Sequence, residues 1–264
     1  MLNYYQQLFD FQGRKVVVTG GAGLLGTEIV KCFAAFHAHT IIADSNETDG
    51  RKLVKEIRAH NQKADFYHFD QSLVEEIPDL IAKLEEQYGS VDAWINSAYP
   101  RTDNWGAKLE DISVGSWQKN VDMHLNGYCI SSNEIARRMA NRKRGVIVNM
   151  GSIQSLVAPE FSVYEGTNMT SPAPYTAIKG GILMYSKYLA SYFGKDNVRV
   201  NVVCPGGIFN NQPEEFIERY NKKTLLGRLS DAKEIAPSVL FLASDAASYV
   251  TGAVLVVDGG LTAI

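Results

Sequence analysis

The sequence predicts an α/β fold, in which a doubly wound parallel β-sheet lies between two layers of helices to form a three-layer single domain. Short β-branched apolar runs recur along the chain, and longer amphipathic segments separate them with short connections. This alternation is typical of a parallel sheet that is covered by helices on both faces. Because no repeat, linker or low-complexity tract interrupts it, residues 1–264 are expected to form one domain.

The first expected strand, residues 15–19, is a short β-branched run of the kind found in strands that are buried on both faces. The expected strands cover residues 15–19, 40–43, 64–69, 91–95, 145–150, 198–204 and 253–257. The expected helices carry their apolar residues at helical spacing. They cover residues 27–36, 51–60, 78–88, 117–140, 175–193 and 232–242.

Composition narrows the class of protein. The chain is 264 residues long, 45% hydrophobic and 21% charged, with a formal net charge of −3, so we expect no nucleic-acid partner. Residues 1–11 do not resemble a signal peptide, and no apolar run approaches the roughly 18 residues of a membrane span. Cys32, Cys129 and Cys204 have neither metal-ligand nor disulfide-framework spacing. These features predict a cytoplasmic protein without a metal site or a membrane partner.

A glycine-rich turn joins the first expected strand to the first expected helix. Gly21, Gly23 and Gly26 follow residues 15–19 and match the pattern G-x-G-x-x-G in its required setting of strand, turn and helix. The glycines permit a tight turn, and the helix N-terminus offers unpaired N–H groups to a pyrophosphate. The turn therefore predicts a Rossmann-like site for a dinucleotide, although a plain tight turn is the simpler alternative.

Asp44 ends the second expected strand, 18 residues after Gly26. A carboxylate at this position can accept hydrogen bonds from the adenosine ribose hydroxyls, and it would repel a 2′-phosphate. No Arg or Lys follows before Arg51, so NAD is expected in preference to NADP. The alternative is that Asp44 caps the next helix, a role that Ser45 or Asn46 could equally fill.

Polar residues also follow the other expected strands. In a doubly wound sheet the ligand lies beyond the carboxyl ends of the strands, so these residues should converge on one crevice. They are Asp70, Asn96, Ser152 and the segment 205–210. Tyr175 and Lys179 lie four residues apart at the start of the helix after Ser152, and hence on one helical face. An ammonium group there should lower the pKa of the phenol and make Tyr175 a usable base.

With these residues placed, the chain resembles the short-chain dehydrogenase/reductase family along nearly its full length. The matching features are Thr19-Gly20…Gly26, Asp44, Asp70, Asn96-Ser97-Ala98, Ser152, Tyr175…Lys179, Pro205-Gly206 and Thr251-Gly252…Asp258-Gly259-Gly260. The resemblance implies that Tyr175 transfers the proton, that Ser152 holds the substrate oxygen, and that Lys179 binds the nicotinamide ribose. It also implies cofactor contacts at Gly20, Gly23, Leu24, Leu25, Gly26, Asp44, Asp70, Gln71, Asn96, Ala98, Tyr175, Lys179, Pro205, Gly206, Ile208 and Asn210.

Three single residues depart from the family pattern. Leu24 stands where the family usually has Gly, which is more like its sugar-nucleotide branch. Tyr99 replaces the last Gly of Asn-Asn-Ala-Gly, and should narrow the mouth of the active site or stack there. His124 stands where a catalytic Asn is usual; it could hold a water or relay protons with a pKa near 6.5, or merely pack and bond a backbone carbonyl.

The fourth departure is an insertion of roughly ten residues between Ser152 and Tyr175, at 159–171. Its hydroxyl, amide and aromatic side chains predict a border of the substrate pocket, with an oligomer contact as the alternative. Tyr164 within it, together with Tyr99, Arg101, Ser152 and Tyr175, is expected to contact the substrate. Arg101 could pair with a phosphate or carboxylate. The insertion and His124 resemble a subgroup linked to bacterial surface-glycan and flagellin-modification sugars.

The predicted function is an NAD-dependent oxidoreductase that interconverts a secondary alcohol and a ketone on a polar, sugar-like small molecule. The alternatives are a sugar-nucleotide epimerase or dehydratase that retains its NAD, and a catalytically silent NAD-binding protein. Members of the family are usually dimers or tetramers, so the resemblance also implies a homo-oligomer.

Overall fold

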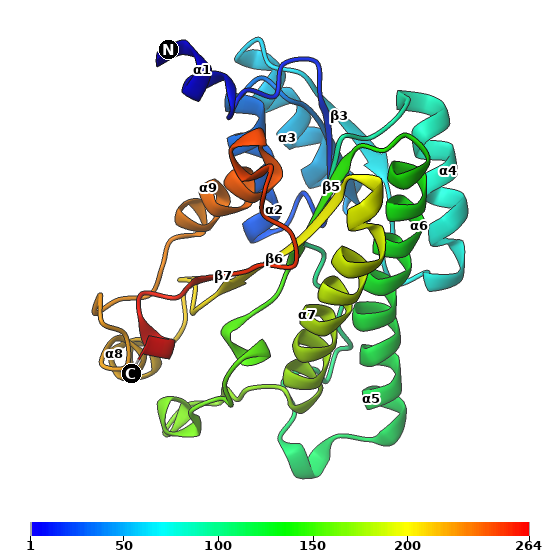
Figure 1. Cartoon of the computed structure of the whole chain (residues 1–264). Coiled ribbons are helices and arrows are strands. Elements are labelled where there is room, and N and C mark those ends of the chain that lie inside the picture. The colour runs from blue at the N-terminus through cyan, green and yellow to red at the C-terminus, as the bar shows by residue number, and fades with distance from the viewer. Residues whose placement is uncertain (1, 264) are drawn as a thin grey trace.

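The computed structural model describes residues 2–263 and contains a seven-stranded sheet in which all neighbouring strands are parallel (Figure 1). The strands are β1 (Lys15–Thr19), β2 (His39–Asp44), β3 (Ala64–His68), β4 (Ala93–Asn96), β5 (Gly145–Met150), β6 (Val198–Pro205) and β7 (Val254–Val257). They lie in the order β3-β2-β1-β4-β5-β6-β7. The strand order reverses direction beside β1, which is the arrangement of a doubly wound sheet and confirms the predicted fold class.

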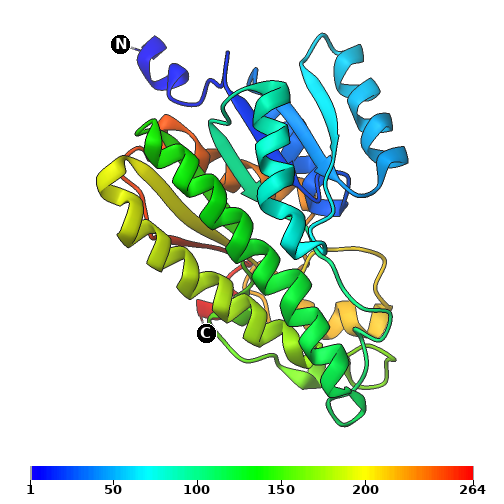
Figure 2. The same cartoon turned by 90° about the vertical axis from the view of Figure 1, so that its right-hand side faces the viewer.

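Helices cover both faces of this sheet. The α-helices of the described chain are α1 (Leu2–Gln7), α2 (Leu24–Ala35), α3 (Glu47–Ala59), α4 (Ile77–Tyr88), α5 (Val114–Asn120), α6 (Gly127–Asn141), α7 (Ala173–Phe193), α8 (Glu214–Asn221) and α9 (Ala232–Ala243), of which α2, α3, α4, α6, α7 and α9 pack on the sheet. Buried side chains of α2, α3 and α9 form one core cluster, and those of α4, α6 and α7 form the other. Figure 2 shows α6 and α7 running alongside each other over the second face.

The pleat of each strand explains why apolar residues face both sides of the sheet. Val16 and Val18 of β1 belong to the cluster under α2, α3 and α9, whereas Val17 belongs to the cluster under α4, α6 and α7. All three side chains are fully buried. Because successive side chains point to opposite faces and both faces are covered, most strand side chains are apolar, and buried polar ones such as Asn96 are hydrogen-bonded.

Every expected strand and helix is present, with ends that differ by a few residues. The expected helix 117–140 is interrupted, because a π-helical stretch (Val121–Asn126) joins α5 to α6. The helices α1 and α8 were not expected. Both are short, at six and eight residues, and a short polar segment carries little periodic signal.

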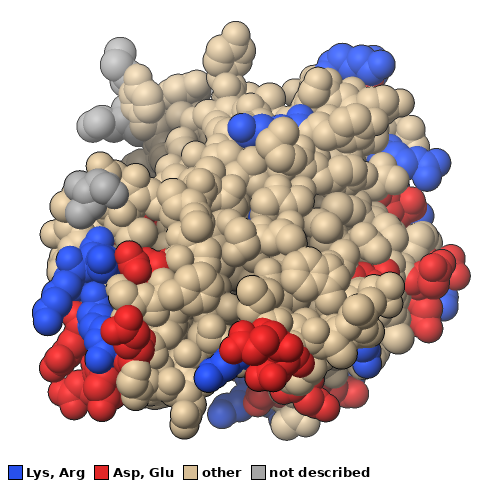
Figure 3. Space-filling model, turned by 90° about the horizontal axis from the view of Figure 1, so that it is seen from below, with Lys and Arg blue, Asp and Glu red and all other residues tan. Residues whose placement is uncertain are grey.

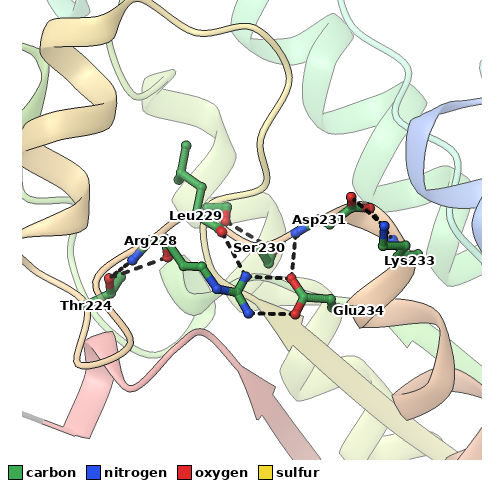
Figure 4. Close-up of polar contacts among 8 residues, drawn as sticks. Thr224, Arg228, Leu229, Ser230, Asp231, Lys233 and Glu234 are labelled. Carbon is green, nitrogen blue, oxygen red and sulfur yellow. Dashed lines mark hydrogen bonds and ion pairs between the residues drawn. The ribbon is translucent and has the colours of Figure 1, made fainter.

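The segment between β6 and α9 is held by a polar cluster at the start of α9 (Figure 4). Asp231 caps the helix by accepting the N–H of Lys233 at 3.0 Å. Glu234 accepts two hydrogen bonds from the guanidinium of Arg228, at 2.6 and 2.7 Å, and one from the N–H of Asp231. These contacts fix the far end of a loop that begins at the pocket described below.

Within residues 2–263, no helix is both long and apolar enough to cross a membrane. The same part of the chain holds no group of three or more His, Cys, Asp or Glu side chains arranged to bind a metal ion. Cys32, Cys129 and Cys204 are free thiols, and burial raises the pKa of each.

Candidate active site

A pocket of about 570 Å³ opens at the carboxyl ends of the strands. Figure 3 shows this end of the molecule from below, with charged side chains gathered mainly towards its edge. The predicted site residues that line the pocket are Gly20, Gly23, Leu24, Leu25, Gly26, Asp44, Asp70, Gln71, Ala98, Tyr99, Arg101, Ser152, Tyr175, Lys179, Pro205, Gly206, Ile208 and Asn210. The strand order places Asp44 and Asp70 at one end of the pocket and Ser152 and Tyr175 towards the other. We call these the Asp44 end and the Tyr175 end.

The glycine turn brings backbone to the floor of the pocket. Gly20 has φ +63°, and a Cβ on it would lie 2.5 Å from the Cα of Ala98; a Cβ on Gly26 would lie 1.9 Å from the carbonyl oxygen of Gly20. Side chains are therefore excluded at both positions. Gly23 is the N-cap of α2, and no side chain caps the helix there. The N–H groups of its first turn are thus available to an anion, which fits the pyrophosphate of a dinucleotide.

Asp44 lies at the end of β2 with both carboxylate oxygens hydrogen-bonded to backbone. It accepts the N–H of Ala22 at 2.9 Å and the N–H of Asn46 at 2.8 Å. Asn46, not Asp44, caps α3 by accepting the N–H of Asp49. The alternative assignment of Asp44 as a helix cap is therefore wrong. Its remaining lone pairs face a pocket that it lines.

Gln71 and Asp70 complete the Asp44 end. The Gln71 side chain is only 3% exposed, yet neither its amide oxygen nor its amide nitrogen has a hydrogen-bond partner within residues 2–263. Asp70 uses one carboxylate oxygen, Oδ1, to accept the N–H and O–H groups of Ser72. A buried amide without partners costs free energy unless a ligand supplies them. A base such as adenine, which carries both donors and acceptors, fits this requirement.

At the Tyr175 end, Lys179 lies one helical turn after Tyr175, as predicted. Its Nζ lies 5.6 Å from the centre of the Tyr175 ring and donates a hydrogen bond to the carbonyl oxygen of Met150 at 2.8 Å. Ser152 follows β5, and its Oγ accepts the N–H of Gln154 at 3.1 Å. The Ser152 hydroxyl proton is thus free to reach the Tyr175 oxygen or a ligand.

Burial has the largest effect on the pKa values of Tyr175 and Lys179. It raises the pKa of Tyr175 well above its ordinary value, an effect that nearby Tyr99 adds to and a hydrogen bond with Ser152 opposes. Burial also lowers the pKa of Lys179 to about 7. The expected lowering of the Tyr175 pKa by Lys179 is therefore not found, because loss of hydration destabilises the charged form of both groups.

The Tyr175 ring belongs to an aromatic cluster, which consists of Tyr99, Trp105, His124, Tyr128 and Tyr175. Tyr99 and Trp105 contact that ring edge to face, with centroids 5.9 and 6.1 Å away. The indole N–H of Trp105 donates to the hydroxyl of Tyr99 at 2.8 Å, and the Tyr128 hydroxyl donates to the carbonyl of Ala98 at 2.9 Å. Tyr99 thus lines the pocket, and its ring contacts are edge to face and not stacked. The sequence did not predict the other members of this cluster as a group.

His124 belongs to the aromatic cluster but does not line the pocket. It is fully buried on the π-helical stretch, with ring centroids 5.3 Å from those of Tyr99 and of Tyr128. Neither ring nitrogen has a hydrogen-bond partner within residues 2–263, so the expected bond to a backbone carbonyl is absent there. Burial, with a smaller effect of Lys179, lowers the pKa of His124 well below 6.5. Of the roles left open for His124, the proton relay with a pKa near 6.5 is therefore not supported.

Asn96 also lies outside the pocket. Its amide is fully buried, donates to Ser132 at 2.9 Å and to Asn149 at 2.8 Å, and accepts the indole N–H of Trp94 at 2.8 Å. These bonds tie β4 to β5 and α6. Because every polar atom of its side chain is engaged, the structure does not support the expected cofactor contact.

The insertion 159–171 packs on α8. Val163 is buried with Phe216 and Tyr220 of α8, and Tyr164 lies 5.3 Å from the Phe216 ring. The guanidinium of Arg219 donates to the carbonyl of Glu165. No residue of the insertion, Tyr164 included, is among those that line the pocket. Tyr164 nevertheless lies near enough to Tyr175 and Tyr99 to raise the pKa of both slightly, so its contact with a substrate stays a prediction.

Several lining residues were missed. They are Ser45, Phe69, Ser97, Pro100, Tyr128, Met150 and Gly151. Tyr128 could have been predicted from the sequence, since it follows His124 by four residues and so shares its helical face. The Nζ of Lys179 lies 5.1 Å from the Tyr128 ring. The other six are neighbours in sequence of expected site residues and contribute mainly backbone or small surfaces.

Comparison with known proteins agrees with this geometry. Residues 21–262 match the family model described as enoyl-(acyl carrier protein) reductase. The chain is 32% identical over 251 residues to post-translational flagellin modification protein A of Campylobacter coli, covering 94% of this chain and 98% of that protein.

Two solved structures share the fold over nearly their whole length. One is a gluconate 5-dehydrogenase from Burkholderia cenocepacia in complex with NADP and tartrate, with TM-score 0.88, 27% identity, and coverage of 98% of this chain and 99% of that one. The other is a short chain dehydrogenase from Leptospira borgpetersenii with bound NAD+, with TM-score 0.82, 31% identity, and coverage of 97% and 95%. The chain belongs to the short-chain dehydrogenase/reductase family of NAD(P)-dependent oxidoreductases.

Proposed function

We propose that this protein is an NAD-dependent dehydrogenase that interconverts a secondary alcohol and a ketone on a polar, sugar-like substrate. The observation that carries the proposal is the presence of Ser152, Tyr175 and Lys179 in one pocket with the glycine turn and Asp44. A bound nicotinamide would supply the hydride acceptor or donor. The protein itself must then bind the substrate oxygen and move one proton.

Tyr175 is the group that moves the proton. With its pKa raised by burial, Tyr175 is a neutral phenol at pH 7 and can donate its proton to a ketone oxygen during reduction. In the opposite direction it must lose that proton first, so oxidation should speed up as pH rises. The Ser152 hydroxyl donates to the same substrate oxygen and orients it. Lys179 binds the nicotinamide ribose and faces the Tyr175 ring.

The preference for NAD rests on charge at the Asp44 end. Asp44 and Asp70 are the ionisable residues there, and the only basic residues that line the pocket are Arg101 and Lys179. Arg51, the first basic residue after Asp44, is paired with Glu47 at 2.6 Å. A 2′-phosphate would therefore meet a carboxylate without a cation to offset it. We expect NAD to bind at least about tenfold more tightly than NADP.

A polar substrate is favoured by the relatives and by the pocket. The gluconate 5-dehydrogenase neighbour acts on a sugar acid and was solved with tartrate, which is also a hydroxylated acid. The Tyr175 end presents the hydroxyls of Ser152 and Tyr99 and the guanidinium of Arg101. These groups can hydrogen-bond a hydroxylated ligand while the Tyr99 ring covers its carbon skeleton.

The test is an NADH-formation screen of the purified protein against polyols, sugar acids, sugar phosphates, nucleotide sugars and small secondary alcohols. Steady release of NADH with one of them supports a dehydrogenase. Conversion of a nucleotide sugar without net NADH would instead favour the epimerase or dehydratase alternative. Tight NAD binding without any turnover would favour the silent NAD-binding protein.

We also propose a homo-oligomer, either a dimer or a tetramer, that works in cytoplasmic carbohydrate metabolism. The support is the family membership, together with an acidic composition and three free thiols. Light scattering checks the oligomer directly, and a monomer at micromolar concentration would contradict it.

A further inference from the structure

We infer that the substrate carries an anionic group, a carboxylate or a phosphate, and that Arg101 binds this group at the mouth of the pocket. The inference rests on the proposed function and specifies its substrate class. Arg101 is exposed and lines the pocket just beyond the end of β4. Within residues 2–263, no carboxylate lies within ion-pair distance of its guanidinium.

Arg101 rests on a platform that the protein holds in place. Its Cζ lies 5.3 Å from the centre of the Tyr99 ring, a cation–π contact that restricts the guanidinium. The Tyr99 hydroxyl is in turn fixed by the N–H of Trp105, which is only 8% exposed. Since Tyr99 also contacts the Tyr175 ring, the position of Arg101 relative to the reacting group is set by packed aromatic rings.

The backbone around Arg101 is anchored as well. Pro100 precedes it, and Thr102 follows it with its N–H donated to Oδ1 of Asn120 at 3.0 Å. Asn120 is only 1% exposed and also donates to the hydroxyl of Thr102 at 2.8 Å. A long side chain on a restrained backbone loses less conformational freedom on binding a ligand than one on a mobile backbone.

The distribution of charge points to an anion at this end. Lys179, the other cation of the pocket, already donates to the Met150 carbonyl, whereas no hydrogen bond from Arg101 to residues 2–263 is formed. A guanidinium offers parallel N–H groups that match the oxygens of a carboxylate or a phosphate. One small molecule can contact both Tyr175 and Arg101, because each lies against the same Tyr99 ring.

The test compares charged and neutral ligands that share a six-carbon, polyhydroxylated skeleton. Gluconate, glucose 6-phosphate and uncharged glucitol are titrated calorimetrically into the protein saturated with NADH, and NADH formation from each is assayed with NAD. We expect an anionic member to bind at least about tenfold more tightly than glucitol. Gluconate and glucose 6-phosphate separate a carboxylate from a phosphate.

The variants are Arg101→Gln, Arg101→Lys and the control Arg137→Gln, which removes the same charge from an exposed site on α6. Arg101→Gln should raise the dissociation constant of the anion by roughly 10- to 100-fold and leave glucitol and NADH within about twofold. Arg101→Lys should give a smaller loss, since it keeps the charge but not the planar fork. Arg137→Gln should change neither constant.

The inference is overturned if no anionic member binds, if glucitol binds equally well, or if Arg101→Gln weakens NADH as much as the anion. The last result would assign Arg101 to the cofactor. Failure of the proposed function looks different. Anion binding that depends on Arg101, without any NADH formation, would support the anion site and reject the proposed reaction. Turnover of neutral alcohols that Arg101→Gln leaves unaffected would support the reaction and reject the anion site.

Discussion

The two ends of the pocket are built on different principles. The Asp44 end consists of backbone and short polar groups: the glycine turn, a carboxylate held by two N–H groups, and the unpaired amide of Gln71. The Tyr175 end is enclosed by the aromatic cluster, whose side chains position one another. The first end departs from the family pattern at Leu24, and the second departs from it at Tyr99 and His124.

This difference indicates which part is shared and which is specific. A dinucleotide has the same shape in every relative, so backbone geometry at a strand–helix junction suffices to bind it. A substrate differs between relatives, and the side chains around it must differ too. Substitutions at the Tyr175 end should therefore alter turnover and substrate choice, whereas those at the Asp44 end should alter cofactor choice.

The largest effect is expected from Tyr175→Phe, which removes the proton donor and keeps the ring packing. Turnover of the best substrate should fall by about a thousandfold or more, within the usual contribution of acid–base catalysis and hydrogen bonding to the reacting oxygen. Binding of NADH, measured by fluorescence, should remain within about twofold. Tyr249→Phe is the matched control, because Tyr249 is fully exposed, does not line the pocket and should keep its activity. Full turnover by Tyr175→Phe would reject the proposed mechanism.

The sequence predicted the Asp44 end better because its signals are local. A glycine turn between a strand and a helix, or an Asp at the end of a strand, can be recognised from a few neighbouring residues. The aromatic cluster could not be recognised in this way, since Trp105, His124 and Tyr175 come from separate segments that only the fold brings together.

The insertion illustrates the same limit. Its position between Ser152 and Tyr175 follows from the sequence, but its packing partner was not predicted. That partner, α8, begins more than forty residues later and is too short to be evident from periodicity. The pKa values of Tyr175 and Lys179 could not be predicted from their spacing of four residues, because these values depend on burial.

A second prediction concerns stability and Lys179. Its pKa of about 7 in the folded protein lies below the ordinary value near 10.4, so between these pH values the unfolded chain binds a proton that the folded chain does not. Stability from this group should therefore rise with pH, by about 2 kcal/mol between pH 7 and pH 9. Lys179→Met should lack this rise in urea unfolding of the protein without added cofactor.

Lys187→Met is the control for that measurement, because Lys187 lies exposed on the same helix. It should keep the pH dependence of the unmodified protein. Equal gains in stability between pH 7 and pH 9 for Lys179→Met and the unmodified protein would contradict the prediction. Lys179 would then not titrate in this range, and it would contact the Met150 carbonyl as a charged ammonium throughout.

A third prediction tests the Asp44 end. Asp44→Asn keeps the size of the side chain and an oxygen that can accept a backbone N–H, but it removes the negative charge. The ratio of the NADP to the NAD dissociation constant should fall by roughly tenfold, mainly through tighter NADP binding. Asp79→Asn, on the exposed start of α4, should leave the ratio unchanged. An unchanged ratio in Asp44→Asn would mean that Asp44 does not select the cofactor.

The smallest effect is expected at His124, although it occupies the position of a catalytic Asn in the family. Burial favours the neutral imidazole, so its ring signals in a nuclear magnetic resonance titration should not shift between pH 5 and pH 8. His124→Asn identifies those signals by their loss, and its pH–rate profile should keep the same shape, with turnover within about threefold. A midpoint inside that range, or a profile that loses one limb in His124→Asn, would instead make His124 part of the proton path. The Tyr175 end would then depart from the family in its chemistry as well as in its shape.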